Sequence, residues 1–293
     1  MRLNTSKMTV RASSLFCFGL GYSARVLAAG LQHEGFVVAG TSRSPVDDPH
    51  MKAFGPQHAF EDAWLDGVTH LLISIPPDSD GDPVLQAAGE SLTRRARQFD
   101  WVGYLSTTGV YGDHGGGVVD ETTPVQPGPG RSTWRAQAEA GWQALHITHG
   151  LPLHIFRLAG IYGPGRNALV NALAGTARRI DAPGQLFSRI HVQDIATVLH
   201  ASIAKPNPGA FYNVCDDEPA SGADVTAFAC ILAGVPPPPL VALADADLSP
   251  MARSFYRDNR RVRNDRIKSE LGVRLAYPTY REGLTALWAE MRN

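Results

Sequence analysis

The chain has 293 residues, of which 44% are hydrophobic and 19% charged, with a formal net charge of −1. This length can bury a large core, in one big domain or in one domain with a smaller lobe. The absence of a basic tract argues against nucleic acid as a main partner. No apolar run approaches the ~20 residues that span a bilayer.

Three scattered cysteines predict no disulfide framework, and ten histidines show no metal-ligand spacing, so no metal is expected. Residues 1–12 are polar and slightly basic, lack the apolar stretch of a secretory signal, and are expected to form a loose tail. Cytoplasmic location is the default expectation.

The most informative pattern is a strand, a glycine turn and a helix near the start. A short apolar run ends at Gly19, and a helical pattern follows Gly21. This arrangement holds a dinucleotide pyrophosphate at a helix N-terminus. Gly19 permits the tight turn, and Gly21 lets the backbone approach the phosphates without a Cβ in the way. Ala24 stands at the third glycine position of the G-x-G-x-x-G dinucleotide-binding pattern. The predicted cofactor contacts in this turn are Gly19, Leu20, Gly21, Tyr22 and Ser23. An ordinary strand–helix turn is the alternative interpretation.

The second predicted strand, 36–43, ends in Thr41, Ser42 and Arg43. An acidic residue at this place would bind a ribose 2′-hydroxyl, whereas two hydroxyls and a guanidinium suit a 2′-phosphate. The sequence therefore favours NADP over NAD as cofactor. The alternative interpretation makes Arg43 a solvated loop residue.

Strands and helices alternate along the next 150 or so residues, which predicts a parallel sheet covered on both faces. Further strands are expected at 58–60, 68–75, 101–106, 153–158, 188–192 and 211–214, and helices at 83–99, 133–149 and 168–180. The fourth strand ends at Ile75 and Pro76, where apolar contacts to a dinucleotide are expected. We expect a doubly wound Rossmann domain over 13–160, with 190–215 returning to it, and a small discontinuous α/β lobe over 161–293.

Several segments in this order resemble the extended short-chain dehydrogenase/reductases, the NAD(P)-dependent epimerase/dehydratase-like proteins. The resemblance spans nearly the whole chain, and it rests on the glycine turn and on residues 105–112, 157–165, 190–196, 212–214, 259–272 and 277–284. It implies a Rossmann fold, a nicotinamide cofactor and a small-molecule substrate. It also implies that Ser106, Ala159 and Tyr162 lie at the cofactor.

The resemblance makes Thr107 catalytic, with its hydroxyl bonded to a substrate carbonyl or hydroxyl, and places Thr108 at the substrate. The family's catalytic tyrosine and lysine are missing: alignment on Glu139 puts Arg131 and Arg135 at their places. Arg135 still offers positive charge to a ribose or phosphate, but an arginine with a pKa above about 12 is no base near neutral pH.

Two nearby phenols could substitute as proton donors: Tyr111, for which core packing is the alternative, and Tyr162. Arg166 lies in a loop at a strand's carboxyl end, where it could reach an anionic substrate or be solvated. His191 is either a buried, hydrogen-bonded residue or a substrate contact in the cleft.

The expected function is that of an NADP-dependent oxidoreductase or epimerase with an atypical active site. A dinucleotide-sensing or scaffold protein without catalysis is the alternative, and loss of cofactor binding is a third possibility. The expected partners are the dinucleotide and an unidentified small molecule, without nucleic acid or membrane, in a monomer or homodimer.

Overall fold

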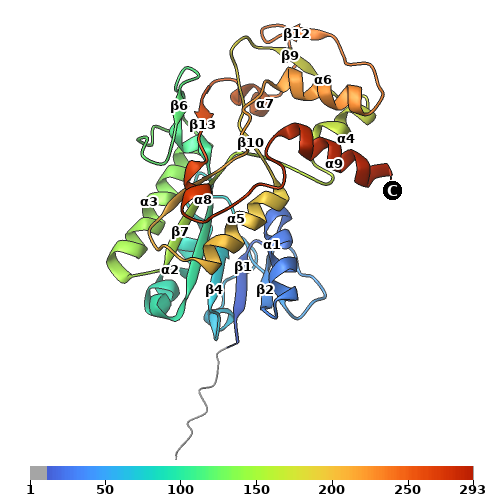
Figure 1. Ribbon diagram of the computed structural model, residues 1–293. Helices are drawn as coiled ribbons and strands as arrows, with labels where there is room; N and C mark the ends of the chain where they lie inside the picture. The colour runs from blue at the N-terminus through green and yellow to red at the C-terminus, as the bar shows by residue number, and fades with distance from the viewer. Residues whose placement is uncertain (1–11, 293) are drawn as a thin grey trace, which may run out of the picture.

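The computed structural model describes residues 12–292 (Figure 1). The predicted tail, 1–12, lies outside the described residues except for its last residue. A seven-stranded sheet forms the centre of the molecule, in the order β11-β7-β5-β4-β1-β2-β3, with every neighbouring pair parallel. Its strands are β1 (Ser14–Phe18), β2 (Val37–Ser42), β3 (Met51–Ala53), β4 (His70–Ile73), β5 (Trp101–Thr107), β7 (Leu153–Leu158) and β11 (Phe211–Val214). The prediction of a doubly wound parallel sheet is confirmed.

Helices cover both faces of this sheet because its strands are apolar on both sides, as in β4 and β7, where every residue is buried. One face carries α1 (Tyr22–His33) and α5 (Val192–Ala204), which pack against each other. The other carries α2 (Pro83–Arg95) and α3 (Arg131–His149). Short 3-10 turns lie at η1 (Asp62–Leu65), η2 (Ala96–Gln98) and η3 (Thr108–Tyr111). Across residues 12–292, no helix combines the length and apolarity that a bilayer crossing requires.

A smaller lobe lies beyond the carboxyl ends of the sheet strands (Figure 1). Its helices α4 (Ala168–Leu173), α6 (Gly222–Leu232) and α9 (Tyr280–Arg292) share a separate apolar core. Two-stranded parallel sheets join β10 (Arg189–His191) to β8 (Gly160–Tyr162), β12 (Leu240–Ala242) to β9 (Arg179–Asp181), and β13 (Arg261–Val262) to β6 (Val118–Val119). Two short helices, α7 (Pro250–Ser254) and α8 (Asp265–Ser269), complete the chain, and α8 contacts β11 of the main sheet.

Two sequence predictions about elements were wrong. The third strand is β3 and not 58–60, where His58 only forms a bridge with Gly55. The crossover before β3 is short, residues 43–50, and contains no helix. The helix expected over 168–180 ends at Leu173, because Gly175 takes a φ of +68° that continues no right-handed helix.

One asparagine joins a loop of the sheet side to a loop of the lobe. The backbone carbonyl of Asn259 accepts from the amides of His114 and Gly116, at 3.0 and 2.9 Å. Its side-chain amide donates to the carbonyl of Gly184 at 2.9 Å. The segments around 114, 184 and 259 are therefore held in one arrangement.

Candidate functional site

The glycine turn after β1 is held between its two neighbouring strands. Gly19 has a φ of +87°, and a Cβ there would lie 2.9 Å from Ile75 Cγ1, so only glycine fits. Its amide donates to Thr41 Oγ1 at 2.8 Å, and its carbonyl accepts from Ser74 Oγ at 2.6 Å. Of the two residues expected to contact a dinucleotide at the end of β4, Ile75 lies against this turn and Pro76 is exposed.

The N-terminus of α1 is open where the turn ends. Gly21 is the N-cap in an extended conformation, no side chain caps the helix, and its first turn holds no acidic residue. A Cβ on Gly21 would meet only the Gly19 carbonyl oxygen, at 4.0 Å. The first amides of α1, from Tyr22 and Ser23 onward, thus face space with the positive end of the helix dipole behind them. An anionic diphosphate fits this cradle.

The end of β2 displays an arginine to solvent. Thr41 is buried, and its hydroxyl accepts from the Gly19 amide at 2.8 Å. Its carbonyl accepts from the Leu20 amide at 2.9 Å. Ser42 donates its hydroxyl to the Ser44 carbonyl at 2.5 Å. Arg43 is exposed. Of the three residues predicted to select the cofactor, Arg43 alone is displayed to solvent, and the other two shape the turn.

The loop after β8 comes back over the start of α1. The Tyr22 hydroxyl donates to the Pro164 carbonyl at 3.0 Å, and a Cβ on Gly163 would lie 2.6 Å from that hydroxyl. Burial raises the pKa of Tyr22, and the nearby charge of Arg166 opposes that rise. Arg166 therefore lies beside the glycine turn, closer to the expected cofactor cradle than the sequence implied.

Two hydroxyls border one point at the carboxyl end of β5. A Cβ on Gly109 would lie 3.3 Å from Thr107 Oγ1 and 3.0 Å from Ser132 Oγ. Thr107 accepts from the Gly109 amide at 3.1 Å, which leaves its own hydrogen free to donate, and it is only partly buried. Ser132 was missed by sequence reasoning, although it follows Arg131 in the first turn of α3. Thr108, predicted at the substrate, is buried beside this pair.

Arg135 is anchored against β5. Its Nη1 donates to the Leu105 carbonyl at 2.7 Å and to the Tyr104 hydroxyl at 3.1 Å, and its guanidinium lies over the Tyr104 ring at 5.5 Å. This half-buried guanidinium places a positive charge near β5, the strand that ends at Thr107. Arg131 is exposed at the start of α3.

Neither candidate phenol is displayed at the crevice. Tyr111 is fully buried, and its hydroxyl donates to Asn213 Oδ1 at 2.7 Å. Tyr162 is 8% exposed and packs in the lobe core, with its hydroxyl 3.4 Å from the Thr279 carbonyl. Burial raises the pKa of both. The packing role left open for Tyr111 is the one that this placement supports.

His191 is likewise buried, at 4% exposure. Its Nδ1 accepts from the Gln193 amide at 3.2 Å and caps α5, and its ring packs on Tyr162 and Tyr277. Burial lowers its pKa to about 4. The buried, hydrogen-bonded alternative therefore describes this residue. Ala159, expected at the cofactor, is buried at the end of β7.

A buried polar network lies directly beneath Thr107. Ser106 donates to Glu139 Oε1 at 2.5 Å, and Arg157 donates to both oxygens of that carboxylate. Arg157 also donates to the Tyr111 hydroxyl at 3.0 Å. The Ser106 hydroxyl, predicted to lie at the cofactor, thereby donates its hydrogen to this network. Among residues 12–292, no group of three or more His, Cys, Asp and Glu side chains is placed to hold a metal.

The parallel seven-stranded sheet with helices on both faces is a Rossmann-like α/β fold, and solved epimerases and dehydratases share it. Among solved structures, the chain matches a conserved protein of unknown function from Silicibacter pomeroyi DSS, at 56% identity and a TM-score of 0.89, over 96% of this chain and 100% of that one. It also matches dTDP-glucose 4,6-dehydratase from Bacillus anthracis str. Ames in complex with NAD, at 18% identity and a TM-score of 0.75, over 96% and 97%. A third match is the human epimerase family protein SDR39U1 with NADPH, at 16% identity and a TM-score of 0.73, over 94% and 99%.

Sequence comparison gives more distant relatives. Protein YeeZ of Escherichia coli K12 is 27% identical over 277 residues, which are 89% of this chain and 94% of that protein. A 3-diazoavenalumate denitrifying reductase of a Streptomyces species is 29% identical over 182 residues, 57% of this chain and 58% of that protein. No protein-family model matches the chain.

Proposed function

We propose that the chain binds NADP(H) in the glycine turn and is an oxidoreductase or epimerase with a rebuilt proton-transfer site. The observation that carries the proposal is the open cradle at Gly21 and the uncapped start of α1, with exposed Arg43 at the end of the adjoining strand. Solved proteins of this fold are described with NAD or NADPH, which supports a nicotinamide dinucleotide here. The preference for the 2′-phosphate rests on Arg43.

The chemistry falls to residues at the carboxyl end of β5. When bound, a nicotinamide dinucleotide donates or accepts a hydride. Thr107 orients a substrate carbonyl or hydroxyl with its free hydrogen. The Thr107 and Ser132 hydroxyls are assigned to relay a proton between solvent water and the substrate oxygen, each giving up its own proton as it takes another, since both border Gly109 and the two phenols are buried elsewhere. A small molecule with a carbonyl or secondary hydroxyl is the substrate class that this arrangement serves.

Cofactor choice is tested by calorimetry with NADP and NAD separately. Arg43→Ala should weaken NADP binding by roughly 10- to 100-fold, the size of a lost charge-assisted bond, and change NAD binding by less than about 2-fold. Arg97→Ala is the matched control, because Arg97 is an exposed arginine in η2. Equal NADP affinity in both variants would remove Arg43 from the proposal.

A non-catalytic dinucleotide sensor is the second candidate, favoured by the two arginines of α3 and by the anchoring of Arg135 to Leu105. Turnover of NADPH with a panel of sugar nucleotides and carbonyl compounds decides between the two. The double change Arg131→Tyr and Arg135→Lys adds a discriminator. Natural turnover that this double variant abolishes excludes the sensor, whereas tight NADPH binding without any turnover supports it.

A further inference from the structure

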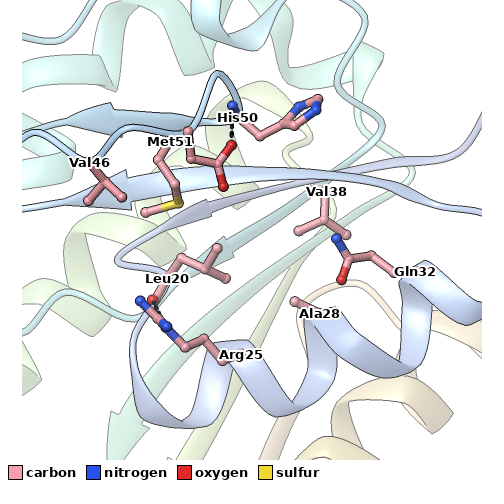
Figure 2. Close-up of a pocket in the computed structure, with 9 residues that line it drawn as sticks. Leu20, Arg25, Ala28, Gln32, Val38, Val46, His50 and Met51 are labelled. Atoms are coloured by element: carbon pink, nitrogen blue, oxygen red, sulfur yellow. Dashed lines mark hydrogen bonds between the residues drawn. The ribbon is translucent and has the colours of Figure 1, made fainter.

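A pocket of about 280 Å³ lies beside the glycine turn, on the flank of α1 (Figure 2). It exists because the crossover between β2 and β3 contains no helix, so residues 43–50 leave part of α1 and β2 uncovered. Leu20, Val38 and Met51 supply apolar walls, and Arg25, Asp48 and His50 supply polar groups. The pocket opens beside the residues that were expected to read the adenosine ribose.

Arg25 is held at this pocket by the turn itself. Its Nε donates to the Leu20 carbonyl at 3.0 Å, and the Leu20 amide donates to the Thr41 carbonyl at 2.9 Å. One residue of the turn therefore ties the Arg25 guanidinium to the end of β2, two residues before Arg43. Figure 2 shows the Arg25 guanidinium lying beside Leu20, at the turn end of the pocket. Its Nη groups form no hydrogen bond or ion pair with any residue that the structure describes.

The charge around the pocket is balanced so that a cation remains available. Asp48 is the acidic residue in its lining, and the carboxylate of Asp48 accepts from the His50 amide at 2.8 Å (Figure 2). A phosphomonoester carries a charge of about −1.5 to −2 at neutral pH, and a planar guanidinium binds two of its oxygens at once.

We propose that Arg25 is a specificity residue for the cofactor, donating to an adenosine 2′-phosphate at the mouth of this pocket while Arg43 contacts it from the end of β2. The inference rests on the proposed function, because it assumes that a dinucleotide lies in the glycine turn. The inference goes beyond the proposed function because it assigns a second arginine, from α1, to the 2′-phosphate that distinguishes NADP from NAD. A single exposed arginine adds little binding free energy in a high dielectric, whereas a guanidinium already fixed by a hydrogen bond loses less entropy when it binds a phosphate.

The test uses adenosine 2′,5′-bisphosphate and AMP, which differ only in the 2′-phosphate, and measures binding by calorimetry without any turnover. Arg25→Ala should weaken binding of the bisphosphate by about 10- to 30-fold and binding of AMP by less than about 2-fold. The bisphosphate affinity of Arg25→Lys should lie between those of the wild type and Arg25→Ala, because an ammonium keeps the positive charge but cannot bind two phosphate oxygens at once as a planar guanidinium does. Arg97→Ala is again the control, and melting temperatures of the variants check that the turn stays folded.

Three outcomes separate the claims. A bisphosphate affinity unchanged in Arg25→Ala, in a protein that binds NADP, overturns the inference and leaves the proposed function standing. Equal weakening of AMP and bisphosphate also overturns it, because Arg25 would then support the turn and not the phosphate. A wild-type protein that binds neither NADP nor NAD overturns the proposed function, and the inference falls with it.

Discussion

Arg157 donates to both carboxylate oxygens of Glu139, at 3.1 and 2.7 Å, with both side chains only 5% exposed. The pair joins α3 to β7 at the level where β5 delivers Thr107. Because Ser106 and Tyr111 bond to the same two side chains, the position of the candidate site depends on this buried charge pair.

Glu139→Gln should destabilise the fold by about 3–5 kcal/mol, because it leaves the Arg157 guanidinium buried without its counter-charge. Urea unfolding at neutral pH measures the change. Glu34→Gln is the matched control, since Glu34 pairs with His200 at the surface, and it should lose less than about 1 kcal/mol. A loss below about 1 kcal/mol in Glu139→Gln as well would mean that the network contributes little to stability.

The two turn glycines should respond differently to substitution. Gly21→Val should abolish dinucleotide binding while shifting the melting temperature by only a few degrees, since its backbone is extended and a Cβ there meets nothing nearer than 4.0 Å. Gly19→Ala should instead lose about 1–3 kcal/mol of stability, through its positive φ and the contact with Ile75. Dinucleotide binding retained in Gly21→Val would place the diphosphate elsewhere.

Neighbouring aspartates at the end of β11 should have opposite effects. Asp216 is buried, and burial raises its pKa to about 8 despite the nearby charge of Arg189 and backbone hydrogen bonds that oppose the rise. Asp217 accepts from Asn264 and Lys268, at 2.7 and 2.6 Å. The unfolded chain ionises Asp216 near pH 4, so this group's contribution to stability falls as the pH rises from about 4 to 8.

Asp216→Asn should therefore stabilise the fold, by at least about 1 kcal/mol at pH 8 and by less at pH 5. Asp217→Asn should destabilise it at both pH values. Chemical denaturation at the two pH values measures both variants. Loss of stability in Asp216→Asn at pH 8 would show that the carboxylate is ionised and held by Arg189.

Two buried histidines should make the protein sensitive to acid. Burial lowers the pKa of His154 and of His191 to about 4, so both are neutral in the fold, whereas the unfolded chain protonates them near pH 6.5. Their stabilising contribution is complete above pH 6.5 and is lost as the pH falls toward 4. In the Asp216→Asn background, which lacks the opposing carboxyl, the free energy of unfolding should fall by about 3 kcal/mol from pH 6.5 to 5.

His191→Asn isolates one of the two. Asparagine is a good helix N-cap, so it should preserve the cap on α5 while removing the titration, and the loss between pH 6.5 and 5 should shrink by roughly half. An unchanged slope would assign the acid sensitivity to other groups.

The main sheet could be predicted from the sequence because its strands are short apolar runs separated by turn signals, as with 101–106 and 153–158. β3 could not, because Met51–Ala53 is a half-buried edge strand of three residues with no apolar pattern. The shortened α4 has a similar cause: alanines continue the helical pattern past Leu173, and the turn at Gly175 ends it.

At the candidate site, residues whose role depends on backbone were predicted best, notably Gly19 and Gly21. The roles of side chains were harder to predict, because the sequence does not show which protein group forms a hydrogen bond with a given hydroxyl or phenol. The hydroxyls of Thr41, Ser106 and Tyr111 all form hydrogen bonds with other groups of the protein. Arg25 went unnoticed because its importance comes from a hydrogen bond to Leu20 and from the helix missing after β2.

The bonds around Asn259 have a consequence for any molecule that enters between the sheet and the lobe. Because one residue fastens the loops around His114 and Gly184, they are set before an incoming molecule arrives. Little loop entropy is then left to lose on association, so affinity is gained through preorganisation. The same rigidity narrows the range of shapes that the entrance accepts.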